Sequence, residues 1–116
     1  MRAILIDVEK QIIIEVWQDG LEDMQRMVGG RIELGHRFYD GEVERNTLFV
    51  DEEGLLKNIV KGFVLIDDAY DVEGGIKFTG NGLICGFDEN TGKTLDCTLS
   101  IDELANNITF VTYHPY

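Results

Sequence analysis

Short segments that favour β-strands recur along the chain, and this pattern limits the fold more than any other feature. Residues 4–6 and 12–17 are the first two such segments, and both are rich in isoleucine. Residues 7–10 separate them, so the pattern predicts an opening β-hairpin. Apolar residues stand at successive positions in both segments, so we expect at least part of the hairpin to be covered on both faces. Further strands are expected at residues 32–34, 47–50, 62–66, 83–87, 94–99 and 108–113.

One segment has the periodicity of an amphipathic helix, which we place at about residues 20–29. Its apolar residues recur at helical spacing: Leu21, Met24, Met27 and Val28. Asp19 stands where an N-cap is expected, directly before the first apolar residue of the series. A Gly29-Gly30 pair ends the segment, and we expect Gly30 to adopt the left-handed conformation that favours glycine.

A second, shorter helix is expected over about residues 101–106, because Ser100 and Glu103 fit a capping box. Two short helices among many strands indicate the α+β class, with a mainly antiparallel sheet. A chain of 116 residues is too short for two folded units that each bury a useful core. We therefore expect residues 1–116 to form a single domain.

Two polar stretches interrupt the strand pattern and are predicted to be loops. Residues 38–45 form the first of them. Residues 67–75 contain four acids, no base and a Gly-Gly pair, and we predict a mobile acidic loop there.

The chain carries 22 acidic and 10 basic residues, which gives a formal net charge of −12. This charge repels phosphate backbones, so direct binding to DNA or RNA is disfavoured. The same charge attracts basic proteins, because complementary potentials steer association. The alternative interpretation is that the acids only keep a small protein soluble.

The two cysteines, Cys85 and Cys97, are too few to stabilise a domain of this size by disulfide bonds, and their spacing matches no zinc-binding pattern. Alternation places both on one apolar face of a predicted hairpin, and we predict that both thiols are buried and reduced. The apolar start of the chain is too short for a signal peptide or a membrane span. These features together indicate a cytoplasmic protein without a membrane anchor.

Fragments of ligand-binding and catalytic motifs occur, but none is complete. Residues 80–86 lack the spacing and the following helix of a dinucleotide-binding site. Residues 92–94 resemble the end of a phosphate-binding loop, yet acids precede them where phosphate would bind. Residues 88–96 lack the central glycine and the final acid of a calcium loop. His36 and His114 have no nucleophile beside them in the sequence, although a Cys–His pair formed in space stays open. We therefore expect no enzymatic activity, cofactor or metal.

Three pieces of the sequence together resemble one family of small proteins. They are residues 24–33 with the order Val-Gly-Gly-Arg-Ile-Glu at their end, residues 48–57 with Glu-Glu-Gly-Leu-Leu-Lys, and residues 82–88. In this order they resemble a domain of unknown function found in phages, plasmids and bacteria, over about residues 1–110. The resemblance implies a mobile-element context, and it implies no activity, cofactor or catalytic residue.

The leading hypothesis is a non-enzymatic interaction protein of a phage or other mobile element, located in the cytoplasm of the host cell. It would act stoichiometrically on a host or bacterial-defence protein through an acidic surface. The candidate partner-binding residues are Asp67, Asp68, Tyr70, Asp71 and Glu73.

The alternative hypothesis is a small-ligand binder that captures a nucleotide or another anionic metabolite. Its candidate contacts are Arg26, Arg31, Arg37 and Arg45. The oligomeric state stays open, a homo-oligomer included.

Overall fold

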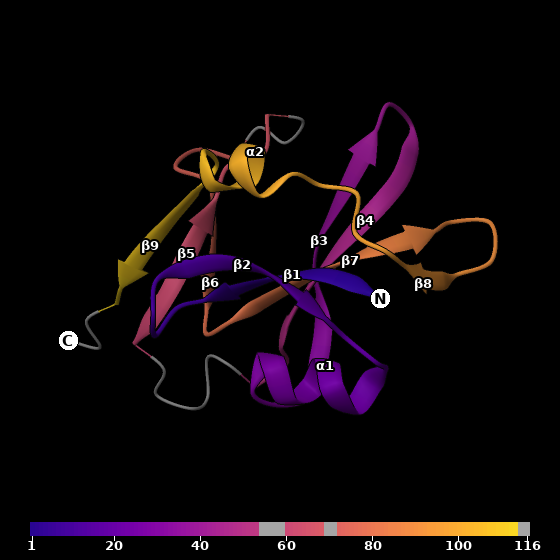
Figure 1. Cartoon of the computed structure of the whole chain (residues 1–116). Coiled ribbons are helices and arrows are strands. Elements are labelled where there is room, and N and C mark those ends of the chain that lie inside the picture. Colours follow the sequence, from indigo (N-terminus) through magenta and orange to yellow (C-terminus); the bar gives the residue numbers. More distant parts are fainter. Residues whose placement is uncertain (54–59, 69–71, 114–116) are drawn as a thin grey trace.

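The computed structural model describes residues 1–53, 60–68 and 72–113, and it has the predicted α+β class (Figure 1). Its strands form two antiparallel sheets. The larger sheet has the order β2-β1-β7-β4-β3, with β8 paired to β7, and the smaller has the order β6-β5-β9. The strands are β1 (Arg2–Asp7), β2 (Ile12–Trp17), β3 (Ile32–Asp40), β4 (Val43–Asp51), β5 (Lys61–Leu65), β6 (Ile76–Thr79), β7 (Gly82–Asp88), β8 (Lys93–Leu95) and β9 (Ile108–Thr112). The helices are α1 (Leu21–Val28) and α2 (Ile101–Ala105).

The predicted opening hairpin is present as β1 and β2, in a regular antiparallel register from Arg2–Trp17 to Asp7–Ile12. The expectation of two covered faces is correct for β1 and wrong for most of β2. β1 lies between two strands and is largely buried. β2 ends the sheet, so the side chains of Ile12, Ile14 and Trp17 are exposed.

The predicted first helix is confirmed as α1, but both of its caps differ from the prediction by one residue. Gly20 is the N-cap in place of Asp19, because its φ of 116° is a conformation that favours glycine. The left-handed residue at the other end is Gly29, with φ of 100°, and not Gly30. Leu21 was predicted to belong to the packed face, yet it is 58% exposed, because α1 buries Met24 and Val28 instead.

The prediction of a loop at residues 38–45 is wrong, because β3 and β4 continue through it as a hairpin. Asp40 pairs with Val43, so Gly41 and Glu42 alone make the turn. Gly41 has φ of 66°, which is typical of two-residue hairpin turns. Side chains such as Tyr39 and Arg45 at this end of the hairpin are exposed, so the apolar alternation of a half-buried strand is missing there.

The remaining elements agree with the prediction except for β6 and for β8, which ends at Leu95 although a strand was expected up to residue 99. Hairpin β7–β8, strand β9 and helix α2 are present, and the Oγ of Ser100 accepts a hydrogen bond from the N–H of Glu103 at 3.4 Å. β6 was not predicted. It has only four residues and forms by pairing with β5 from Gly62–Thr79 to Leu65–Ile76.

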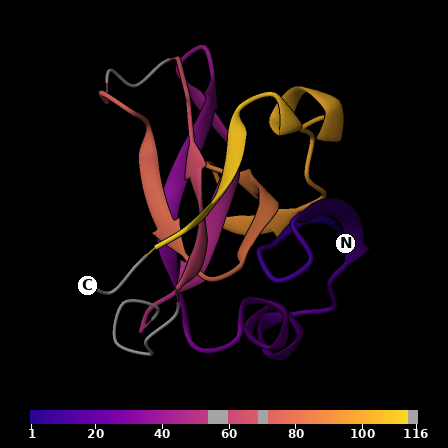
Figure 2. The same ribbon diagram turned by 90° about the vertical axis from the view of Figure 1, so that its left-hand side faces the viewer.

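The larger sheet is covered on both faces, and the two cores lie on its opposite sides (Figures 1 and 2). On one side the smaller sheet and α2 pack over residues such as Ile4 and Leu48. On the other side α1 packs over Ala3 and Leu83. Both cysteines are buried and free, as predicted, but the prediction of one shared face is wrong. Cys85 belongs to the α1 side and Cys97 to the opposite core, because the chain leaves the strand geometry after Leu95.

Candidate functional site

Asp67, the first of the predicted partner-binding acids, lies directly after β5 and contacts a buried histidine. Its Oδ2 atom is 2.8 Å from Nε2 of His36, a residue of β3 whose side chain is only 5% exposed. The His36 ring also packs edge-to-face against Phe38, with 4.9 Å between the ring centroids. Asp67 therefore connects the two sheets, which is a structural role in addition to any role in binding.

The other acids of this segment have different surroundings. Asp68 and Glu73 are exposed, and neither forms an ion pair with any residue that the structure describes. Tyr70 and Asp71 lie outside the described residues. Among the described loop acids, Asp68 and Glu73 are thus the carboxylates open to a partner.

A pocket of about 190 Å³ lies beside this segment, between the end of β5 and helix α2. We call it the acidic pocket. Its lining includes three acidic residues, Asp67, Asp68 and Glu103, together with apolar residues such as Leu65 and Leu104. Glu103 was recognised in the sequence only as part of a capping box, since nothing local indicates that α2 packs near residue 68. A lining of acidic and apolar residues suits a lysine or arginine side chain, whose stem is apolar and whose tip is charged.

The four arginines of the alternative hypothesis lie on different elements, and two of them contact carboxylates. Arg26 of α1 pairs with Asp23, and this pairing lowers the pKa of the Asp23 carboxyl group. Nε of Arg37 lies 3.4 Å from Oε1 of Glu44, a buried acid that also accepts a hydrogen bond from the hydroxyl of Thr47. Arg31 and Arg45 are exposed and form no ion pair within the described part of the chain. Anion binding by Arg26 or Arg37 would have to compete with these acids.

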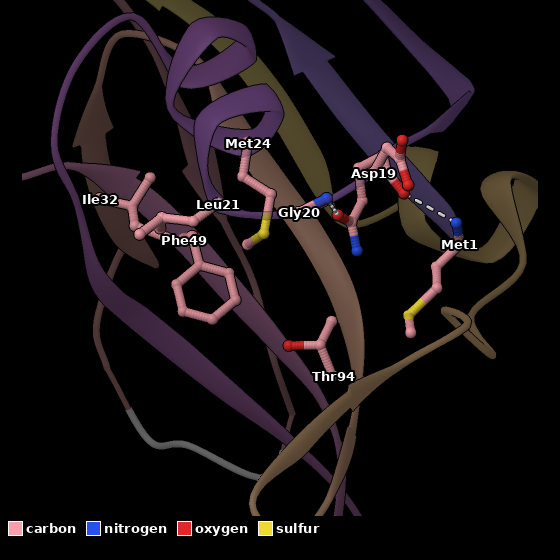
Figure 3. A pocket seen from close by; sticks show the side chains of 9 residues that line it. Met1, Asp19, Gly20, Leu21, Met24, Ile32, Phe49 and Thr94 are labelled. Carbon is pink, nitrogen blue, oxygen red and sulfur yellow. Dashed lines mark hydrogen bonds between the residues drawn. The ribbon is translucent and has the colours of Figure 1, made fainter.

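An open apolar groove of about 480 Å³ lies where β2 leads into α1 (Figure 3). Its apolar lining comes from Met1, Leu21, Met24, Ile32 and Phe49. Gln18 also lines the groove and is only 3% exposed. Its side-chain Oε1 accepts a hydrogen bond from the N–H of Gly20 at 2.8 Å. The sequence did not predict this groove, because it depends on Leu21 pointing away from the core.

The described cysteines and histidine have the surroundings of structural residues. Burial raises the pKa of the Cys85 thiol to about 12, and it also raises the pKa of Cys97. Such thiols are weak nucleophiles at neutral pH because they stay protonated. His114 lies outside the described residues. Within residues 1–53, 60–68 and 72–113, no group of three or more His, Cys, Asp or Glu side chains could hold a metal ion.

The fold and its surface define an acidic α+β domain with two antiparallel sheets and small surface pockets. The chain belongs to a family described as a domain of unknown function, DUF3846, whose family model matches residues 1–109. The predicted resemblance to such a family is thereby confirmed. No curated protein and no solved structure matches the chain. No helix in the described segments is long and apolar enough to cross a membrane.

Proposed function

We propose that the chain is a non-enzymatic interaction protein of a phage or other mobile element. It binds a host or bacterial-defence protein stoichiometrically through its acidic surface. The observation that carries this proposal is the acidic pocket, whose lining includes Asp68 and Glu103, from distant parts of the chain, and several apolar residues.

The pocket supports recognition of a basic residue on the partner. The carboxylate of Asp67 already contacts His36, so Asp68 and Glu103 are the groups that meet an incoming lysine or arginine. Ile66 lines the same pocket and is 49% exposed, so it offers apolar surface to the stem of that side chain. An apolar contact surrounded by opposite charges combines a binding anchor with electrostatic selection.

The net charge of −12 supports the same proposal at longer range. A strongly negative surface raises the rate at which a basic protein encounters it, and salt weakens this effect. The proposal therefore requires an association rate that falls as ionic strength rises.

The test compares the protein with two variants that each lose three negative charges. The first variant neutralises the acidic surface with Asp68→Asn, Glu73→Gln and Glu103→Gln. The matched control neutralises exposed acids elsewhere, with Glu22→Gln, Glu33→Gln and Glu42→Gln. Each tagged protein is used to capture partners from bacterial lysate at low salt, and the captured proteins are identified by mass spectrometry. We expect one partner that the unchanged protein and the control retain and the first variant loses.

A partner that all three proteins retain equally would contradict the role of the acidic surface. Mass spectrometry of small molecules released on denaturation tests the alternative hypothesis in the same samples. A stoichiometric anionic metabolite without a protein partner would favour the ligand binder. The genes that neighbour the coding sequence test the mobile-element origin separately.

A further inference from the structure

Strand β2 forms one end of the larger sheet, and its outer edge pairs with no strand in the described part of the chain. Its backbone N–H and C=O groups on that side are available to another strand. Ile12 and Ile14 are each 37% exposed, and Trp17 is 66% exposed. Exposed apolar side chains beside an open backbone edge are a site where a further strand can add.

The other described edges differ from β2. β9 is uncharged, but its exposed side chains are Thr109 and Thr112 and not large apolar ones. β8 has three residues and an exposed Lys93. β3, at the opposite end of the larger sheet, has two register irregularities, and it carries exposed charges at Glu33 and Arg37. In the smaller sheet, β6 has four residues and an exposed Lys77. Short strands, bulges and charges are the usual protection of sheet edges.

β2 lacks this protection. It has six residues in an unbroken register with β1 and contains no lysine, proline or glycine. Its one charged residue, Glu15, is held by Arg2, with 3.1 Å between Oε2 and Nε. From this contrast we propose that β2 pairs antiparallel with β2 of a second copy of the chain.

The two faces of β2 determine which register such a dimer takes. Val16 lies opposite Ala3, and Ala3 belongs to the core under α1. Alternation therefore places Ile12, Ile14 and Val16 on the α1 face, and it places Ile13, Glu15 and Trp17 on the other face. In a symmetric antiparallel dimer a twofold axis perpendicular to the sheet relates the two β2 strands. Rotation about this axis keeps each face of β2 on the same side of the combined sheet, so only residues of the same face can lie opposite each other.

Centring the axis on Ile14 satisfies this condition and gives apolar pairs. Ile14 then lies opposite Ile14 of the second copy, and Ile12 lies opposite Val16. Glu15 lies opposite Ile13, so the two Glu15 carboxylates do not face each other. Centring the axis on Glu15 would place like charges directly opposite, which is destabilising. Centring the axis on Ile13 would overlap only residues 12–14 of each strand. Of the two registers that overlap five residues, the Ile14-centred one is thus the one that keeps like charges apart, and the protected β3 edge stops growth at a closed dimer.

Disulfide trapping tests this register directly. In the Ile14-centred dimer, Ile14→Cys places two cysteines directly opposite, where a disulfide can form with small adjustments. Ile13→Cys is the matched control, because Ile13 lies opposite Glu15 of the second copy, so its two copies are offset along the strands and the charge of Glu15 is kept. The native Cys85 and Cys97 are buried and do not compete. We expect mild oxidation to cross-link Ile14→Cys and to leave Ile13→Cys uncross-linked. Equal cross-linking of the two variants, or none of Ile14→Cys, would overturn the proposed register.

Analytical ultracentrifugation of uncross-linked protein tests the dimer itself. We expect the unchanged protein to sediment with the mass of two chains and Ile14→Lys with the mass of one. Leu34→Lys, on the exposed part of edge strand β3, is the control that stays dimeric. A monomeric unchanged protein throughout a concentration series would overturn the proposal.

The effect of salt concentration distinguishes dimerisation from the proposed binding of a basic partner. Two copies of a chain with net charge −12 repel each other, so added salt should strengthen the dimer. Binding to a basic partner should weaken under the same conditions. A dimer that weakens with added salt would therefore overturn pairing through the apolar β2 edge, whatever the result for the acidic pocket.

Discussion

Nε2 of His36 lies 2.8 Å from Oδ2 of Asp67, and this contact connects the edge of the larger sheet to the end of the central strand of the smaller one. The two residues are 31 positions apart in the sequence. The histidine is almost fully buried while the carboxylate is partly exposed. The first acid of the predicted binding loop therefore helps to hold the two sheets together.

Replacing Asp67 should destabilise the fold, while replacing its neighbour should not. Asp67→Ala leaves the buried His36 without this acceptor, and loss of a buried hydrogen-bond partner costs about 1–3 kcal/mol. Asp68→Ala removes an exposed side chain, and we expect a change within about 0.5 kcal/mol. Urea denaturation of both variants measures the free energy of unfolding. Equal midpoints for the two variants would contradict a structural role for Asp67.

The buried thiol of Cys85 should make stability depend on alkaline pH. Burial raises its pKa in the folded protein from 9.0 to about 12, and the nearby Cys97 adds to this rise. A raised pKa contributes stability that is fully present below the unfolded value and is lost as pH rises toward the folded value. We therefore expect the free energy of unfolding to fall between pH 9 and pH 12. Cys85→Ala should fall less steeply over the same range, and parallel curves would show that Cys85 does not contribute.

The left-handed conformation of Gly29 should distinguish valine from asparagine at that position. Gly29 has φ of 100° and open space where a Cβ atom would lie, so the cost of substitution is conformational and not steric crowding. We expect Gly29→Val to destabilise the protein by about 1–2 kcal/mol. Gly29→Asn should cost less, because asparagine tolerates left-handed conformations at helix ends. Thermal or urea unfolding measures both, and equal losses would contradict a conformational origin.

Gly86 should tolerate no side chain, for a different physical reason. A Cβ atom there would lie 2.1 Å from the backbone oxygen of Asp96, which is far inside van der Waals contact. Gly86→Ala should therefore cost about 1–3 kcal/mol or more, because backbone must move to relieve the overlap. Thr94→Ala on the neighbouring strand serves as the control, with an expected change within about 0.5 kcal/mol. A denaturation midpoint of Gly86→Ala equal to that of the control would show that β7 and the segment after β8 are further apart.

The sequence predicted the elements whose signals are local. The isoleucine-rich strands of the first hairpin, the helical spacing of Met24 and Val28, and the N-cap at Ser100 were predicted correctly for this reason. Periodicity and capping act over a few residues, so a single segment contains the information. Both caps of α1 were misplaced by one residue, because Asp19 is also a favoured N-cap type and Gly30 is also a glycine, so residue type alone did not distinguish them from Gly20 and Gly29.

Tertiary structure alone decided which distant residues meet. β6 exists because β5 offers it a partner, and the polar end of β3–β4 is a hairpin because its two strands pair with each other. Glu103 of α2 and Asp68 after β5 line one pocket, and packing of the two sheets brings Asp67 to His36. These contacts depend on the burial of many residues from distant parts of the chain, and a short segment of sequence does not predict that burial. The sequence by itself determined an acidic α+β chain of short strands, whereas only the packing of its sheets produced the acidic pocket and left β2 as an open edge.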